Sequence, residues 1–130
     1  MSSIHPRPGA LGAAREALDP DSPVVMINLL RFREQAEDDS SRTGREAYAD
    51  YGRHTQPLLA SVGGQVMHSG GVAGMLIAPD GESWDDVLIV RYPHYGAFLS
   101  MVMSDAYQAI VHHRTAALAD SRLIATRGSA

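Results

Sequence analysis

The pattern of apolar and polar positions divides the chain into short strand-like runs and longer segments with helical periodicity. The first apolar run, 24–33, reads VVMINLLRFR and contains one amide, Asn28. Because successive side chains of a strand point to opposite faces, Asn28 shares its face with Met26 and Leu30. A buried amide without a hydrogen-bond partner costs about 1–3 kcal/mol, so this strand predicts a polar cavity at Asn28.

A capping-box pattern predicts the start of the first long helix. Thr43 stands at the N-cap position and Glu46 follows three residues later, which indicates a helix over 43–61. At about 100° per residue, Tyr48 and Tyr51 fall on the apolar face of this helix. We therefore expect both phenol groups to lie toward the protein interior, where they are candidate ligand-binding or catalytic groups.

An arginine interrupts the apolar stripe of the last helix, which is expected over 105–119. Tyr107, Val111 and Arg114 follow one another on this stripe at helical spacing. A partly buried guanidinium seeks a carboxylate, backbone carbonyls or a bound anion, and its planar fork binds carboxylates bidentately. Tyr107 and Arg114 are therefore candidate ligand-binding residues, with an internal pairing of the arginine as the alternative.

The series of elements indicates the order β-α-β-β-α-β after a short N-terminal helix. The expected ranges are a helix over 9–18, a strand over 24–33, a helix over 43–61, a strand over 65–69 that resumes over 72–78, a strand over 86–92, helices over 94–103 and 105–119, and a strand over 122–126. This is the ferredoxin-like arrangement of the α+β class, with helices on one face of an antiparallel sheet. We expect a single domain, 1–130, with an N-terminal helical extension over 1–22 and a core over 23–127.

The sheet face without helices predicts a homodimer. Large exposed apolar patches are rare on monomers, so two copies are expected to close their sheets around a shared interior as a dimeric α+β barrel. Alternation along 86–92 separates Arg91 from Tyr92. If Tyr92 packs beneath the helices, Arg91 faces the open side and lines a dimer-enclosed cavity with Asn28. An interface salt bridge is the alternative role for Arg91.

Two histidines are candidates for acid–base chemistry or ligand binding. His54 lies at the edge of the apolar face of the 43–61 helix, three residues after Tyr51, where it could act as a general base. His68 lies on a glycine-interrupted strand and could point inward. We assign His54 and Tyr51 as candidate catalytic residues and His68 as a candidate ligand-binding residue. The spacing of the histidines does not suit a metal, so no metal site is expected.

Composition narrows the classes of function. The chain has 130 residues and a formal net charge of −4, which argues against a nucleic-acid surface. The absence of cysteine excludes disulfides and zinc–thiolate sites. No segment approaches the roughly 20 apolar residues of a membrane span, and the first twenty residues do not read as a signal peptide. We therefore expect a cytoplasmic protein without nucleic-acid or membrane partners.

Several phrases of the sequence are together similar to one bacterial family. They are VVMINLLRF, Tyr48 and Tyr51 followed by a glycine pair, VLIVRYP, and SDAYQAIVHHRTAAL. Over roughly 23–127 the chain resembles the family called domain of unknown function 1330. The resemblance implies a dimeric α+β barrel of ferredoxin-like subunits and carries over Asn28, Tyr107 and Arg114 as family positions. It implies no established reaction.

Three functions are compatible with these residues. The first is a cofactor-independent enzyme acting on a small organic acid or carbonyl compound. Arg114 or Arg91 would hold an oxygen anion, Asn28 would donate a hydrogen bond, and His54 or a tyrosine would move the proton. The second is a non-catalytic ligand-binding or accessory dimer. The third is a haem- or metal-binding, monooxygenase-like protein, which requires His54 or His68 in the cavity.

Overall fold

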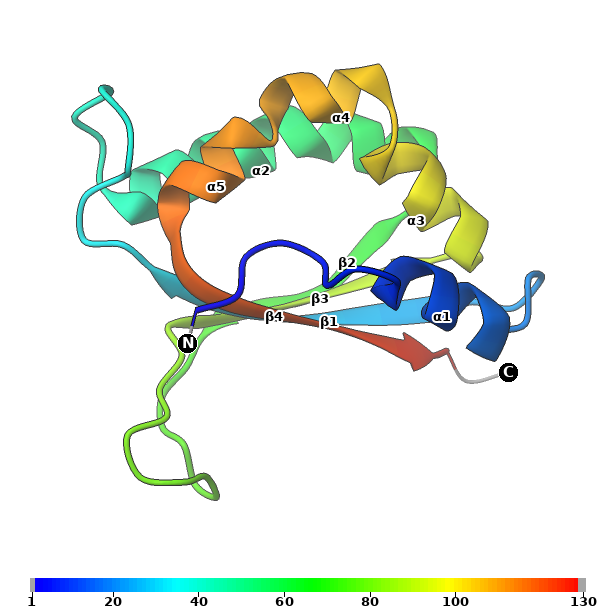
Figure 1. Ribbon diagram of the computed structural model, residues 1–130, viewed down its shortest axis with the longest axis horizontal. Coiled ribbons are helices and arrows are strands. Elements are labelled where there is room, and N and C mark those ends of the chain that lie inside the picture. The colour runs from blue at the N-terminus through cyan, green and yellow to red at the C-terminus, as the bar shows by residue number, and fades with distance from the viewer. Residues whose placement is uncertain (1, 129–130) are drawn as a thin grey trace.

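Helices cover one face of a four-stranded antiparallel sheet, and α2 to α5 leave the other face bare (Figure 1). This computed structural model describes residues 2–128. Its elements are α1 (Ala10–Ala17), β1 (Val24–Phe32), α2 (Gly44–Ser61), β2 (Gln65–Gly71), β3 (Asp86–Tyr92), α3 (Tyr95–Val102), α4 (Asp105–Ile110), α5 (His112–Ala117) and β4 (Leu118–Arg127). The strands lie in the order β2-β3-β1-β4. The expected βαββαβ arrangement with an extra N-terminal helix is confirmed.

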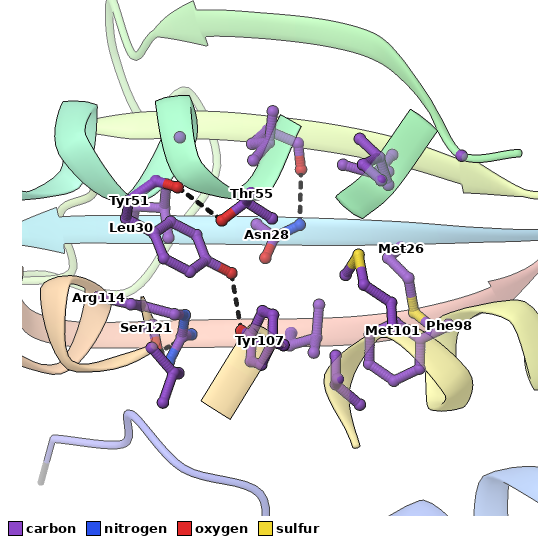
Figure 2. A pocket seen from close by; sticks show the side chains of 18 of the residues that line it. Met26, Asn28, Leu30, Tyr51, Thr55, Phe98, Met101, Tyr107, Arg114 and Ser121 are labelled. Atoms are coloured by element: carbon purple, nitrogen blue, oxygen red, sulfur yellow. Dashed lines mark hydrogen bonds between the residues drawn. The ribbon is translucent and has the colours of Figure 1, made fainter. Parts of the chain in front are cut away.

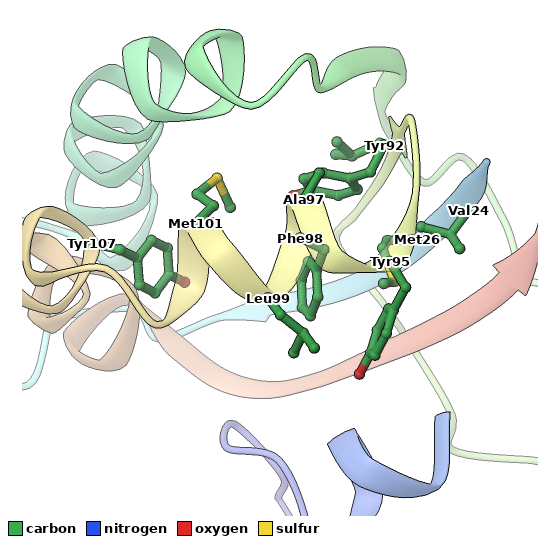
Figure 3. Packing of buried hydrophobic residues seen from close by; sticks show 10 residues of the cluster. Val24, Met26, Tyr92, Tyr95, Ala97, Phe98, Leu99, Met101 and Tyr107 are labelled. Carbon is green, nitrogen blue, oxygen red and sulfur yellow. The ribbon is translucent and has the colours of Figure 1, made fainter. Parts of the chain in front are cut away.

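The main hydrophobic core lies between the sheet and α3. Val24 and Met26 of β1 and Tyr92 of β3 pack against Phe98 and Met101 of α3 (Figure 3). Full burial of one such side chain contributes about 1.5–3 kcal/mol, so this cluster holds α3 against the strands. A second, smaller cluster surrounds the fully buried side chains at the start of β4 and the end of β1.

The register of the strands decides which side chains face the helices. Asn28 lies opposite Leu88 of β3 and Leu123 of β4. Residues directly opposite one another in antiparallel strands point to the same face, so these three side chains share the helix-covered face. Arg91 lies opposite Val25, whose side chain takes the bare face. The expectation that Asn28 and Arg91 line one cavity is therefore wrong, because alternation within a strand does not determine the register between strands.

The N-terminus of α2 has the predicted capping box. The Thr43 hydroxyl accepts a hydrogen bond from the Glu46 N–H at 3.1 Å, and the Glu46 carboxylate accepts one from the Thr43 N–H at 2.8 Å. Gly44 is required after the cap, because a Cβ there would overlap the main-chain carbonyl of Arg33. The helix then continues past Pro57 to its end. Local sequence thus positions α2, which carries two of the tyrosines considered below.

The predicted strand does not resume over 72–78. The last residue pair between β2 and β3 is Gly71 with Asp86, where β3 begins. The residues that follow Gly71 therefore have no partner strand. The Val72 N–H donates to the carbonyl of Asp85 at 2.8 Å and closes the base of a long hairpin loop there. This loop extends on the bare side of the sheet (Figure 1).

The predicted 105–119 helix divides into α4 and α5 at Val111. The strand β4 then begins at Leu118, four residues earlier than the alternation indicated. Leu118 pairs with Phe32 of β1 and is fully buried, so tertiary packing ends the helix before its periodicity does. Within residues 2–128, no helix has the length and apolar character needed to cross a bilayer.

A candidate ligand-binding cleft

A large cleft opens between the helix-covered face of the sheet and the helices above it (Figure 2). Its volume is about 1610 Å³. All four strands contribute to the floor, α2 to α5 form the roof, and the N-terminal segment borders one side. The polar side chains that line the cleft include Asn28, Tyr48, Tyr51, Thr55, Tyr107, Arg114 and Ser121. Most of the remaining lining is apolar, which suits a ligand with a hydrocarbon body.

Asn28 places an amide in the apolar floor of the cleft. Its Nδ2 atom donates a hydrogen bond to the main-chain carbonyl of Leu88 at 3.1 Å. The Oδ1 atom lies on the side away from that bond (Figure 2), with Met26 and Leu30 as its neighbours along the strand. The amide therefore retains one acceptor and one N–H for a molecule in the cleft. The strand thus borders a cavity at Asn28, but this cavity lies on the helix-covered face of one subunit and is not the dimer-enclosed cavity predicted together with Arg91.

Three tyrosines form the polar part of the roof. The Tyr51 and Tyr107 hydroxyls lie 2.8 Å apart and join α2 to α4. The ring of Tyr48 packs against that of Tyr51, with 5.2 Å between the centroids. Burial raises the pKa of Tyr48 to about 12, and it raises the pKa of Tyr51 well above the ordinary value. These phenols are protonated at neutral pH and can donate hydrogen bonds, but they cannot serve as bases there.

Arg114 places a guanidinium at the edge of the cleft nearest the N-terminal segment. One of its terminal nitrogens donates to the main-chain carbonyl of Ile4 at 2.5 Å, and the other donates to the Ser121 hydroxyl at 3.3 Å. No Asp or Glu side chain within residues 2–128 forms an ion pair with this guanidinium. Both partners are neutral, so the positive charge is available to an anionic ligand group.

The positive charge acts on the tyrosines of the roof. Arg114 lies close enough to Tyr48 and Tyr51 to lower the pKa of each phenol, although burial outweighs that effect at both. The guanidinium and these phenols therefore belong to one electrostatic site. An oxygen anion bound among them would receive a charged donor and neutral O–H donors together.

The N-terminal strap, which we define as residues 3–7, closes the side of the cleft beside Arg114. The Ser3 N–H donates to the Asp120 carboxylate at 2.7 Å, and the Ser121 hydroxyl donates to the Ser3 carbonyl at 2.6 Å. Burial alone would raise the pKa of Asp120, but hydrogen bonds led by the Ser3 N–H lower it. His5 follows in the strap and lines the cleft. The strap thus supplies both a neutral partner for the guanidinium and an imidazole at the mouth.

Arg91 and His68 do not reach the cleft. Arg91 lies opposite Val25 and Gln65, and His68 lies opposite Ile89, so both side chains take the bare face of the sheet. Neither residue lines the cleft. The predictions that Arg91 lines one cavity with Asn28 and that His68 points inward are therefore wrong, because the sheet separates both side chains from the cleft.

His54 also lies outside the cleft. Its side chain is exposed, and its ring stacks on that of His113 with 5.2 Å between centroids. It sat at the edge of the predicted apolar face, and α2 turns it outward. A general-base role in the cleft does not fit this position, and the haem or metal function loses both histidines on which it depended. No group of three or more His, Asp or Glu side chains among residues 2–128 is arranged to hold a metal.

Three contributors to the cleft were not identified as site residues from the sequence. Ser121 holds Arg114 and the strap at once, and the Thr55 hydroxyl donates to the Tyr51 carbonyl at 2.6 Å. The strap is the third. Thr55 follows Tyr51 by one helical turn, so its spacing could have indicated it. Ser3 and Ser121 are 118 residues apart, and no local pattern connects them.

One protein family matches this chain. The family model described as "Domain of unknown function (DUF1330)" matches residues 39–128. The chain belongs to this family. The match confirms the resemblance seen in the sequence, which brings no reaction with it. Among curated proteins, none matches the chain.

Solved structures with the same fold include proteins of different kinds. A protein of unknown function from Rhodopseudomonas palustris is 38% identical, with coverage of 100% of this chain and 99% of that chain and a TM-score of 0.92. A hydroxynitrile lyase from Passiflora edulis is 11% identical, with coverage of 85% and 96% and a TM-score of 0.60. A dimeric protein of unknown function from Bacteroides fragilis, with a ferredoxin-like fold, is 11% identical, with coverage of 85% and 99% and a TM-score of 0.53.

Proposed function

We propose that this protein is a homodimeric, cofactor-independent enzyme that acts on a small organic acid or carbonyl compound in the cleft. The observation that carries the proposal is Arg114, a cleft-lining guanidinium whose two partners, the Ile4 carbonyl and the Ser121 hydroxyl, are both neutral. Such a cation in a largely apolar cleft fits a ligand that has a hydrocarbon body and one carboxylate or enolate oxygen.

Each polar group has a distinct part in this proposal. Arg114 binds the anionic oxygen through its planar fork. Tyr51 and Tyr107, which share one hydrogen bond at 2.8 Å, stabilise negative charge that develops on a carbonyl oxygen. The amide of Asn28 fixes the orientation of the ligand on the floor. These groups favour reactions that pass through an enolate or alkoxide, since all of them stabilise an oxygen anion.

Proton transfer in this scheme falls to His5. Burial raises the pKa of Tyr48 and of Tyr51, so these two phenols are hydrogen-bond donors and not bases at neutral pH. His5 lines the mouth of the cleft, and an imidazole can accept and return a proton near neutral pH. It takes the role predicted for His54, which does not line the cleft.

The hydroxynitrile lyase among the structural neighbours gives limited support. At 11% identity it shares the fold alone, which establishes that a catalytic site can be built on this architecture. Fold analogy does not transfer a reaction, so the proposal depends on the side chains of this cleft.

Binding is tested by thermal shift with small 2-oxo acids, short-chain carboxylates and aromatic polyketide-like compounds. A ligand at 100 times its Kd stabilises the folded protein by about 2.7 kcal/mol, so selective stabilisation identifies the chemical class. Arg114→Met should abolish the shift caused by carboxylates, whereas Arg91→Met, on the other side of the sheet, should leave it unchanged. A shift that survives Arg114→Met would exclude the guanidinium as the anchor.

Catalysis is tested separately by exchange of the hydrogen next to the carbonyl group for solvent deuterium, measured by NMR. Wild-type protein should accelerate the exchange in any carbonyl compound that binds, and His5→Gln should slow it while retaining most of the binding. If ligands bind selectively but no compound exchanges or reacts, the protein is a non-catalytic ligand-binding dimer instead.

A further inference from the structure

The bare face of the sheet has an apolar centre and an arginine without an acidic partner near one end. The apolar centre consists of Val25, Ile27, Leu29, Val87, Ile89 and Ile124. Arg31 and Arg122 lie toward one end of the strands, where Asp120 pairs with both, and Arg91 lies near the other end. Arg91 forms no ion pair with an acidic side chain within residues 2–128. The face therefore offers both apolar area and an uncompensated positive charge to a partner.

A long loop stands beside this face with an apolar tip. We call residues 72–85, which connect β2 to β3, the arm; it projects on the bare side of the sheet, away from α2 to α5 (Figure 1). Within the arm, Leu76 is 96% exposed and Ile77 is 97% exposed, and we call these two adjacent residues its tip. Two adjacent aliphatic side chains in full contact with water are unfavourable by about 1.5–3 kcal/mol each relative to burial. Burial of the tip against another apolar surface would therefore be favourable.

The root of the arm is firmly anchored. The ring of Trp84 is buried, and the guanidinium groups of Arg31 and Arg122 lie over it, at 5.2 and 5.1 Å from its centroid. The Asp85 N–H donates to the carbonyl of Leu30, and the Asp85 carboxylate accepts a hydrogen bond from the Phe32 N–H, both at 2.8 Å. The root of the arm is therefore fixed to the sheet, while Leu76 and Ile77 are exposed to solvent.

We propose that the arm of each copy packs its apolar tip against a second copy of this chain, and that it extends the contact made by the bare sheet faces. Two facing sheets lie about 10 Å apart, whereas five extended residues from root to tip span up to about 17 Å. The tip can therefore pass the midplane and reach the other subunit. This inference rests on the homodimer of the proposed function and adds the arm as a further segment in contact with the other subunit.

Charge favours a second copy over an unrelated partner. The arm carries Asp80 and Glu82 beyond its apolar tip, while the bare face carries Arg91 without an acidic partner in the described chain. An acidic, apolar arm and a basic, apolar face of the same chain are complementary to each other. In a two-fold dimer this contact is made twice, so a modest interaction is doubled.

The test is the monomer–dimer equilibrium, measured by sedimentation velocity over a dilution series with far-UV circular dichroism as the control for folding. The double variant Leu76→Ser/Ile77→Ser should raise the dimer dissociation constant at least tenfold without a change in the spectrum. Met103→Ser replaces another exposed apolar residue on the helix side and should leave the constant unchanged. Asp80→Arg/Glu82→Arg should weaken the dimer, and adding Arg91→Glu should restore part of the loss.

Three results would overturn the inference. The first is a dissociation constant for Leu76→Ser/Ile77→Ser equal to that of the wild type. If Ile89→Glu in the sheet face converts the protein to monomers in the same experiment, the arm contact is excluded, whereas the proposed homodimer through the sheet faces is supported. The second is a wild-type protein that is monomeric at every concentration, which also removes the homodimer. The third is binding of the wild type to phosphatidylcholine vesicles that the double variant loses while dimerisation is unchanged, which assigns the tip to a lipid surface.

Discussion

At the scale of single residues, the cleft combines one cation with phenols that resist ionisation. Arg114 and Tyr48 illustrate the balance: the guanidinium lowers the pKa of the phenol, but burial is the larger effect and raises it to about 12. Tyr51 experiences the same two influences and also the nearby Tyr107 hydroxyl, which raises its pKa further. The cleft thus keeps the phenols of Tyr48 and Tyr51 protonated while its positive charge remains available.

The raised phenol pKa values predict a loss of stability in alkali. Tyr48 loses its proton near the ordinary value of 10 in the unfolded chain but only near 12 in the folded protein. Between these pH values the folded state binds more protons, so the free energy of unfolding should fall as pH rises from about 10 to 12 and should be independent of this group below 10. Urea unfolding across this range measures the slope. Tyr48→Phe should make it shallower, and an unchanged slope would contradict the assignment.

At the scale of elements, α2 and the N-terminal strap position the groups of the cleft. The capping box fixes the first turn of α2, and the following turns carry Tyr48, Tyr51 and Thr55 over the sheet. The strap has no regular structure, and its place depends on hydrogen bonds to the start of β4 and to Arg114. The helix is therefore specified by local sequence, and the strap by contacts between distant segments.

Loss of the helix cap should destabilise the protein by a defined amount. Thr43→Ala removes the side-chain acceptor for the Glu46 N–H and should lower the free energy of unfolding by about 1 kcal/mol, as measured by urea denaturation. Thr43→Ser retains the hydroxyl and should remain within a few tenths of that of the wild type. Equal losses in both variants would show that the methyl group, and not the cap, is responsible.

Loss of the Ser121 hydroxyl should loosen the strap. Ser121→Ala removes the donor to the Ser3 carbonyl and one partner of Arg114, each worth about 1 kcal/mol, so backbone hydrogen exchange in residues 3–7 should rise at least fivefold. Exchange followed by mass spectrometry measures this. Ser3→Ala is a matched control, because Ser3 is held by its main-chain atoms. Unchanged exchange in Ser121→Ala would show that the strap is held elsewhere.

At the scale of the whole molecule, the two faces of the sheet differ in what they present. The helix-covered face borders the cleft with Asn28, while the bare face presents an apolar centre that includes Ile27 and Ile89. In the proposed homodimer, a cleft within each subunit and a contact surface on the opposite face would allow two sites to operate in one assembly. Arg91 lies on the bare face, apart from the cleft.

A charge in the centre of the bare face should therefore dissociate the protein without emptying the cleft. Ile89→Glu places a carboxylate in the contact between sheets and should convert dimers to monomers in sedimentation experiments, because an unpaired buried charge is strongly unfavourable. The thermal shift caused by a carboxylate ligand should persist in the monomer. A variant that stays dimeric would exclude the bare face as the interface.

The sequence by itself determined features that depend on neighbouring residues. Alternation located β3 over Asp86–Tyr92, and the Thr43–Glu46 pattern located the start of α2. The polar position of Asn28 in an apolar strand indicated a cavity, and helical spacing brought Tyr107 and Arg114 to it. Each of these signals arises from the geometry of one helix or one strand, in which residue spacing alone decides direction.

Tertiary structure alone decided which segments meet. The register of β1 with β3 separated Asn28 from Arg91, although the alternation of each strand was known. The turn of α2 placed His54 outside, and a hydrogen bond over 110 residues brought the strap to Arg114. Such contacts depend on how whole elements pack, and many registers share one local pattern. The sequence therefore predicted a cavity at Asn28, whereas the packing of the sheet, the helices and the strap decided which residues line it.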